Sequence, residues 1–332
     1  MLYLINIDWL ELEIKASDAE SLCDNNCFSI STSYKPKDFI GFNKCNEIKY
    51  KNQSFAKLYS IPSSKLRYKD RNIQLLRLAN ESLYRKGVIE KEIPEFLDTF
   101  LFEPVGLKEM HIAIDSPGLI RKHNTLFNNT SLKRKRALKM SNFLDDSTKD
   151  ITGVTLGSRS SDKFISLYNK SNELEKSHKE YIREYWVNNG LTECSEPIDR
   201  IELRLKRPEL KGLELNIKSL NDPNYLLTLF KQKTESYLAF INDTTKEKFE
   251  VIDWEQFKLI EIKKETKVKY KASTQGIKIT IKNLFLKHIN CNSSIALELA
   301  KEYAKEYCLI GWYHSRQQRW LRENPVFISL QK

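Results

Sequence analysis

Three segments in the middle of the chain alternate between apolar and polar residues, as strands with one buried face do. They span residues 109–115, 163–169 and 198–206. Each segment predicts one face for packing and one face that carries acids, bases, an imidazole or a phenol. If the three strands share a sheet, their polar faces converge into one candidate site.

Each strand contributes different polar side chains to that site. The first carries His111 and Asp115 on one face, and Ser-Pro-Gly ends it directly after the aspartate. The second carries Tyr168, with Lys170 two positions further along the same face. The third carries a row of charged residues, namely Arg200, Glu202, Arg204 and Lys206.

A tyrosine beside a lysine is typical of a nucleophile beside a group that stabilises negative charge. In a chain with a net charge of +11, a phosphodiester is the obvious electrophile for Tyr168 and Lys170. The carboxylates of Asp115 and Glu202 are oxygen ligands that suit Mg²⁺ or Mn²⁺, and the imidazole of His111 favours Mn²⁺.

The same residues have a plainer interpretation. Half-buried strands routinely expose a tyrosine and a lysine. On a solvated sheet face, the two acids would simply pair with nearby cations, which are Arg200, Arg204 and Lys170. Any single strand favours this ion pairing, whereas the three strands together favour a site.

The remaining patterns predict an α+β fold. In residues 1–105 they indicate strands at 3–15, 27–32, 38–43, 46–51, 54–60 and 72–79, and a helix at 94–102. In residues 106–245 they indicate further strands, including 151–157, and helices at 173–189 and 224–241. We therefore expect a pseudo-duplicated, mostly antiparallel sheet with flanking helices, as one domain (1–245) in two halves.

Residues 246–332 form a small basic region of different character. Its lysines include Lys263, Lys264, Lys267, Lys269 and Lys271. Residues 276–282 alternate like a strand, and a long helix is expected from about 293 to 322, with Arg316 and Arg319 near its end. Contact with DNA is the favoured interpretation of these cations, and a solvated face is the alternative. For Lys133 and Arg134, in a basic run, the two interpretations are equally supported.

Composition sets limits but adds little specificity. The 332 residues, 40% of them hydrophobic, can bury the core of one or two domains. The positive charge fits DNA without separating it from RNA or anionic lipid. No stretch of about 18 apolar residues occurs, so no membrane span is expected. Six irregularly spaced cysteines are typical of thiols in a reducing cytosol.

Several of these motifs follow the order found in one protein family. They are Ile7-Asp8-Trp9-Leu10, the strand ending at Asp115, Leu156-Gly157-Ser158-Arg159, Ser161-Asp162-Lys163-Phe164, Tyr168-Asn169-Lys170 with Glu173, and Arg200-Ile201-Glu202-Leu203-Arg204-Leu205. Up to about residue 210 the sequence resembles the replication initiation factor family, the rolling-circle Rep initiators of small plasmids and single-stranded DNA phages. The stretch from Gly157 to Lys170 is the specific part of the resemblance.

The resemblance implies a divalent-metal-dependent enzyme that nicks and rejoins DNA through a tyrosine. Tyr168 would attack the origin DNA and leave a 5′-phosphotyrosine and a 3′-hydroxyl primer. Asp115 and Glu202 would hold Mg²⁺ or Mn²⁺. His111 stands where many relatives have a second acid, so it is either an alternative ligand or the trace of a lost one.

The remaining candidates receive roles from their chemistry. Lys170 is suited to stabilise the phenolate or the phosphorane, and Arg204 or Arg159 to clamp the phosphate. Glu173 is a base, a metal ligand, or only a cap of the following helix.

The expected partners are double- and single-stranded origin DNA, a host helicase, a polymerase, and a second copy in a homodimer. The expected location is the cytoplasm of a bacterial host cell, with no membrane contact. The chain has no Gly-x-x-x-x-Gly-Lys-Ser/Thr loop, so unwinding would come from the helicase.

Two other functions stay open. One is a non-catalytic origin-binding or regulatory protein of the same fold, which would not need all of Tyr168, Lys170, Asp115 and Glu202. The other is a relaxase-like or transposase-like nickase. The common class of such nickases carries a His-hydrophobic-His motif, which this sequence does not have.

Overall fold

The fold is seen in a computed structural model. It describes residues 3–16, 22, 24, 26–34, 42–62, 73–128, 132–134, 140–144, 151–192, 196–211, 213, 217–235, 237–242, 244–262, 280–284, 298–302, 304, 313, 314 and 317, without the side chains of 16, 34, 62, 128, 132–134, 140 and 142.

One antiparallel sheet of ten strands organises the protein. Its strands are β1 (Leu4–Ala16), β2 (Phe28–Tyr34), β3 (Phe42–Tyr50), β4 (Gln53–Pro62), β5 (Ile73–Leu78), β6 (Phe102–Pro117), β8 (Met140–Leu144), β9 (Ile151–Leu156), β10 (Lys163–Asn169) and β11 (Ile198–Lys206). They lie in the order β2-β3-β4-β5-β1-β6-β11-β10-β9-β8. Neighbouring strands run antiparallel throughout.

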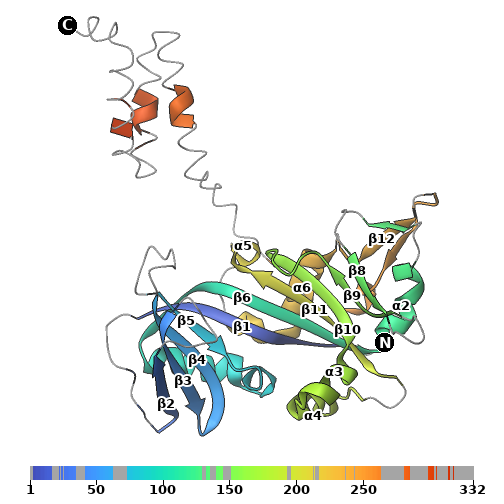
Figure 1. The fold of residues 1–332 in the computed structure, drawn as a ribbon, viewed down its shortest axis with the longest axis horizontal. Helices are drawn as coiled ribbons and strands as arrows, with labels where there is room; N and C mark the ends of the chain where they lie inside the picture. Colours follow the sequence, from blue (N-terminus) through green and yellow to red (C-terminus); the bar gives the residue numbers. More distant parts are fainter. Residues whose placement is uncertain are drawn as a thin grey trace, which may run out of the picture. The chain divides into compact units, whose positions relative to one another are not determined.

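The sheet consists of two halves with the same strand order. In the first half β1 lies beside β5, and β4, β3 and β2 follow outward; in the second half β6 lies beside β11, and β10, β9 and β8 follow. Figure 1 shows β1 and β6 side by side between the two halves. This is the duplicated, continuous sheet that the strand pattern predicts.

Helices and a small second sheet complete the fold. The helical segments are η1 (Ser82–Tyr84), the π-helix η2 (Val88–Glu92), α1 (Ile93–Thr99), α2 (Leu119–Asn128), α3 (Lys170–Ser177), α4 (Glu180–Asn188), α5 (Arg207–Leu210), η3 (Ile217–Asn221), α6 (Pro223–Thr234) and η4 (Trp254–Gln256). The second sheet has the order β13 (Lys248–Glu250), β12 (Ala239–Asn242), β7 (Leu132–Arg134). The fold is therefore α+β, as predicted.

The apolar face of the large sheet forms the core. Ile112 of β6 pairs with Ile7 of β1 on one side and with Leu203 of β11 on the other, and all three are fully buried. Helices α2 and α6 pack against the sheet and contribute Phe127 and Phe230 to the same cluster. The opposite face is therefore left for polar side chains.

Several expected elements differ in the structure. Residues 42–50 form one strand where a break at 44–45 was expected, and the helix expected at 94–102 ends at Thr99. The helix expected at 173–189 is two helices, because His178 has a left-handed φ of 53° and ends α3. The helix expected at 224–241 ends at Thr234, since residues 239–242 pair with β7 and β13 instead. Residues 280–282, expected as the end of a strand, belong to a helical segment at 280–284.

The chain divides into two compact units, Met1–Glu265 and Thr266–Lys332. The functional division expected at residue 245 stays a prediction. The described residues of the second unit are helical. Lys263, Lys264, Lys267, Lys269, Lys271, Arg316 and Arg319 lie outside the described residues. Among the described helices, none is both long and apolar enough to cross a membrane.

Candidate active site

The predicted polar faces do share one side of the sheet. In one cross-strand row, Arg200 of β11 lies opposite Asp115 of β6 and opposite Tyr168 of β10. In the next row, Glu202 lies between Ala113 and Ser166. Register thus brings Asp115, Tyr168 and Glu202 together from three strands.

An irregularity in β1 adds an acid that alternation does not predict. Ile7 pairs with Ile112 but Trp9 pairs with His111, so Asp8 is an extra residue between them. Such a bulge shifts the side-chain alternation by one position. Ile7 and Leu10 are both buried in the core, and Asp8 joins the polar face.

Arg200 lies fully buried between the two aspartates. Its Nε and Nη2 donate to Asp115 Oδ1 and Oδ2 at 2.6 and 2.7 Å, and its Nη1 donates to Asp8 Oδ1 at 2.7 Å. Trp186 Nε1 also donates to Asp115 Oδ2, at 2.7 Å. Burial opposes the charge of Asp8, but Arg200 and a hydrogen bond from Tyr84 hold the pKa of Asp8 well below its usual range. Arg200 and the two aspartates therefore form a network of charged side chains that satisfy one another's hydrogen bonds.

A second chain of hydrogen bonds leads away from Tyr168. The phenol donates to Glu202 Oε2 at 3.1 Å. The other oxygen of Glu202, Oε1, lies 2.8 Å from His111 Nδ1, and His111 Nε2 lies 2.9 Å from Glu109 Oε1. The imidazole is thus held between two carboxylates, and the phenol is connected to both through Glu202.

Ionisation follows from these contacts. Burial raises the pKa of Tyr168 well above its usual value, although Arg200 acts in the opposite direction. Burial also opposes the charge of Glu202, but the hydrogen bond with His111 brings the pKa of Glu202 below its usual value. Despite burial, the bonds to Glu109 and Glu202 raise the pKa of His111 to about 9. At neutral pH the phenol is therefore neutral, Glu202 is a carboxylate and His111 is an imidazolium.

Lys170 is the first residue of α3, so it no longer follows the strand alternation expected for it. Asn169 caps the helix by accepting from Asn172 N at 2.9 Å, which leaves Glu173 without the capping role. Lys170 is buried, its Nζ is paired with Glu173, and it lies 5.7 Å from the centre of the Tyr168 ring. Burial and Arg200 lower the pKa of Lys170.

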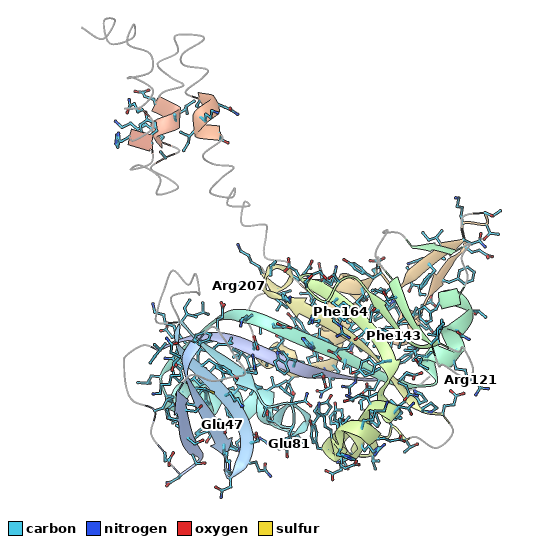
Figure 2. The ribbon with its side chains drawn as sticks, viewed as in Figure 1. Glu47, Glu81, Arg121, Phe143, Phe164 and Arg207 are labelled. Carbon is cyan, nitrogen blue, oxygen red and sulfur yellow. The ribbon has the colours of Figure 1, made fainter. Side chains whose placement is uncertain are left out.

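A cleft of about 410 Å³ opens beside the phenol. It is lined by Phe143, Thr155, Arg159, Phe164, Ser166, Leu167, Tyr168, Glu173, Glu202 and Arg204. Phe143 of β8 and Phe164 of β10 are labelled in Figure 2. Within the described residues neither Arg159 nor Arg204 forms an ion pair; Arg204 donates to the carbonyl oxygen of Arg159 and covers the Phe164 ring at 4.9 Å.

The predicted metal ligands do not converge on one point. Both oxygens of Asp115 accept from Arg200, which is the plainer ion-pairing interpretation of this residue. Glu202 and His111 bind each other. In the described part of the chain, no group of three or more His, Cys, Asp or Glu side chains is arranged to hold a metal ion. As they stand, these residues do not fit Mg²⁺ or Mn²⁺.

The other predicted DNA contacts are only partly described. Arg159 lies at the cleft, in the turn between β9 and β10. Lys133 and Arg134 belong to β7, but their side chains are outside the described set.

Fold and site together define an α+β protein that holds a half-buried phenol against a carboxylate on an antiparallel sheet. No family model matches the chain, and no curated protein matches it. Among solved structures, the chain is similar to the rolling circle replication initiator protein from Geobacillus stearothermophilus, at 12% identity and a TM-score of 0.39, over 79% of this chain and 94% of that one.

Proposed function

We propose that the protein is a rolling-circle replication initiator that nicks and rejoins DNA by transesterification at Tyr168. The observation that carries the proposal is the hydrogen bond from the Tyr168 phenol to the ionised Glu202, beside a cleft with two arginines. The motifs from Gly157 to Lys170 that resemble the replication initiation factor family support it.

Glu202 supplies the base that this half-buried phenol needs. Because the pKa of Tyr168 is raised, spontaneous ionisation is rare at neutral pH, and a nearby carboxylate within hydrogen-bond reach overcomes this. The Tyr168 oxygen forms the new bond to phosphorus as its proton passes to Glu202. The bond from phosphorus to the 3′ oxygen breaks, and that oxygen takes a proton from water to become the 3′-hydroxyl.

Cations around the phenol stabilise the negative charge that develops. The Nζ of Lys170 lies 5.7 Å from the centre of the Tyr168 ring, and Arg200 lies directly opposite Tyr168 on the neighbouring strand β11. Arg159 and Arg204 line the cleft in which a phosphate would lie, and guanidinium groups bind phosphate through two parallel hydrogen bonds. Reversal of the same step rejoins the strand, so no nucleotide cofactor is consumed.

The family resemblance also implies a bound divalent ion, Mg²⁺ or Mn²⁺. When bound, such an ion would polarise a non-bridging oxygen of the phosphate. Asp115 would have to leave Arg200 to become a ligand. The steps proposed for Tyr168 and Glu202 therefore run on the chain's own side chains.

The proposed partners are origin DNA in duplex and single-stranded form, a host helicase, a polymerase and a second copy of the chain, in the cytoplasm of a bacterium. The basic segment after residue 245 is proposed to bind the origin. The sequence supports this through its lysines and its net charge of +11.

A non-catalytic DNA-binding protein of the same fold is the second candidate. The ion pair between Asp115 and Arg200 favours it, because removing one partner of a buried ion pair is strongly destabilising, so the pair has a structural role that needs no chemistry. The two candidates differ in whether the hydroxyl of Tyr168 is used.

The test is to incubate the full-length protein with a supercoiled plasmid carrying its own gene, with Mg²⁺ or Mn²⁺. We expect a nicked circle attached to protein. Tyr168→Phe should abolish both the nick and the adduct while DNA binding persists. Tyr181→Phe is the matched control, since Tyr181 lies on α4 and donates to Asn80. Adducts formed by Tyr168→Phe, or none formed by the wild type, would contradict the proposal.

A further inference from the structure

The opening motif Ile7-Asp8-Trp9-Leu10 places an aromatic side chain beside the candidate site. The motif lies on β1, in the first half of the sheet, and β1 pairs with β6 of the second half. Because Asp8 is the extra residue of the bulge, Trp9 lies directly opposite His111 of β6. The bulge therefore brings a side chain of the first half next to one of the second.

The rings of Trp9 and His111 are stacked. Their centroids are 5.9 Å apart and their planes differ by 26°, within the range of offset-stacked aromatic pairs. On β5, the other neighbour of β1, the guanidinium of Arg77 lies 5.0 Å from the centre of the Trp9 ring. Arg77 is itself fixed by Glu11, whose Oε1 accepts from its Nε at 2.8 Å. The indole thus contacts a planar group from the strand on either side of it.

The indole nitrogen does not account for a tryptophan at this position. Trp9 Nε1 is buried and has no hydrogen-bond partner within the part of the chain that the structure describes. A buried donor without a partner is unfavourable. The contribution of Trp9 therefore comes from its ring, which contacts His111.

His111 connects this ring contact to the phenol. Its Nδ1 lies 2.8 Å from Glu202 Oε1, and its Nε2 lies 2.9 Å from Glu109 Oε1. The other oxygen of Glu202 accepts from Tyr168 at 3.1 Å. The two carboxylates hold the imidazole in its own plane, and the stacked indole limits the tilt of that plane. Orientation of the carboxylate that faces the phenol thus depends on both kinds of contact.

We propose that Trp9 is a positioning residue, which acts through His111 on the carboxylate of Glu202. Stacking keeps the imidazole, and with it Glu202, in the orientation that receives the proton of Tyr168. This inference rests on the proposed function and gives the opening motif of the first half a part in the chemistry of the second. Transfer of a proton to a base depends on the distance and direction of the hydrogen bond, so loss of the stacked ring should slow the reaction.

The stacking can be measured on the full-length protein without DNA. Histidine labelled with ¹³C at Cε1 gives one NMR signal for each of the five histidines, and the signal lost in His111→Gln belongs to His111. Trp9→Leu should shift this signal, because the ring current of the indole is lost. Trp9→Phe keeps a ring and should give a smaller shift. Trp254→Leu is the matched control, since the Trp254 ring packs on Phe230 and Phe257 and should leave the signal unchanged.

Nicking of the plasmid by the same full-length proteins measures the functional part. Trp9→Leu should lower kcat by about two- to tenfold with KM unchanged, the change expected from loss of one aromatic pair. Trp9→Phe should restore part of the rate. In the His111→Gln background, Trp9→Leu should have no further effect, because residues that act in series are not additive. Trp254→Leu should have the same effect on kcat in both backgrounds.

Two results would overturn the role of Trp9. One is an unchanged His111 signal in Trp9→Leu, and the other is an equal loss of kcat with and without the imidazole. A wild-type protein that does not nick contradicts the proposed function instead. The NMR measurement then still decides whether Trp9 holds the His111 ring.

Discussion

Tyr168 and Glu202 lie on adjacent strands in neighbouring rows, and the phenol reaches diagonally across to donate to the carboxylate at 3.1 Å. The residue directly opposite Glu202 is Ser166, whose small side chain leaves this diagonal open. Glu202 was expected from the sequence as a metal ligand. Its contact with the phenol instead supports the role of general base.

Glu202→Gln should lower the rate of nicking by about 10²–10⁴-fold, which is the usual contribution of a general base. Glutamine keeps the shape and the hydrogen-bond acceptor but cannot take the proton. The rate of nicked-circle formation is measured together with the circular dichroism spectrum. Glu47→Gln on β3 is the control, because Glu47 is exposed in the other half of the sheet. A variant that nicks at the wild-type rate would remove Glu202 from the mechanism.

Asp115→Ala should reduce the free energy of unfolding by about 3–5 kcal/mol, as expected when one partner of a buried ion pair is removed. Arg200 would be left buried with Asp8 as its remaining carboxylate partner in the described network. Urea unfolding measures this decrease, with Asp98→Ala at an exposed position of α1 as control. A stable variant whose nicking no longer depended on Mg²⁺ or Mn²⁺ would instead assign Asp115 to a metal.

Asp199 should make stability depend on pH in a direction opposite to most acids. Its Oδ2 accepts from Ile120 N at 2.8 Å, at the start of α2, and burial raises the pKa of Asp199 to about 6. A raised carboxyl pKa adds stability below about pH 4, and this contribution is lost as the pH rises through 6.

Asp199→Asn keeps an acceptor for Ile120 without the charge. The free energy of unfolding of the variant, relative to that of the wild type, should therefore rise by on the order of 2–3 kcal/mol between pH 4.5 and pH 7. Urea titrations of both proteins at the two pH values measure the difference. A constant difference between them would show that Asp199 titrates normally in the fold.

Alternation alone was sufficient to predict the strands and faces that form the site. Each of 109–115, 163–169 and 198–206 has one mainly apolar face, so the position of Tyr168 and Glu202 on the other face follows from a period of two. A pseudo-duplicated sheet in two halves was likewise expected, although the order of its strands was not. Register between strands could not be predicted, because it depends on pairs that are distant in sequence.

Asp8, Lys170 and Asp115 show where the pattern stops being informative. Asp8 reaches the site only because β1 has a bulge, which the spacing of Ile7 and Leu10 by three positions could have indicated. Lys170 leaves the strand because Asn169 caps a helix. The pairing of Asp115 with Arg200 was one open alternative, and only the register of β6 and β11 decides between it and an open carboxylate.

The lysines after residue 260 should contribute to binding of the origin. Replacing Lys263, Lys264 and Lys267 by glutamine in the full-length protein removes three positive charges. Each lysine that neutralises a phosphate releases counterions, so the slope of log affinity against log salt should fall by about 0.9 for each phosphate that the variant no longer neutralises. Sequence preference should persist if these lysines bind only the backbone. The control carries glutamine at the exposed lysines 49, 86 and 91. Equal slopes for the variant, the control and the wild type would place origin recognition elsewhere and leave this segment without a role in DNA binding.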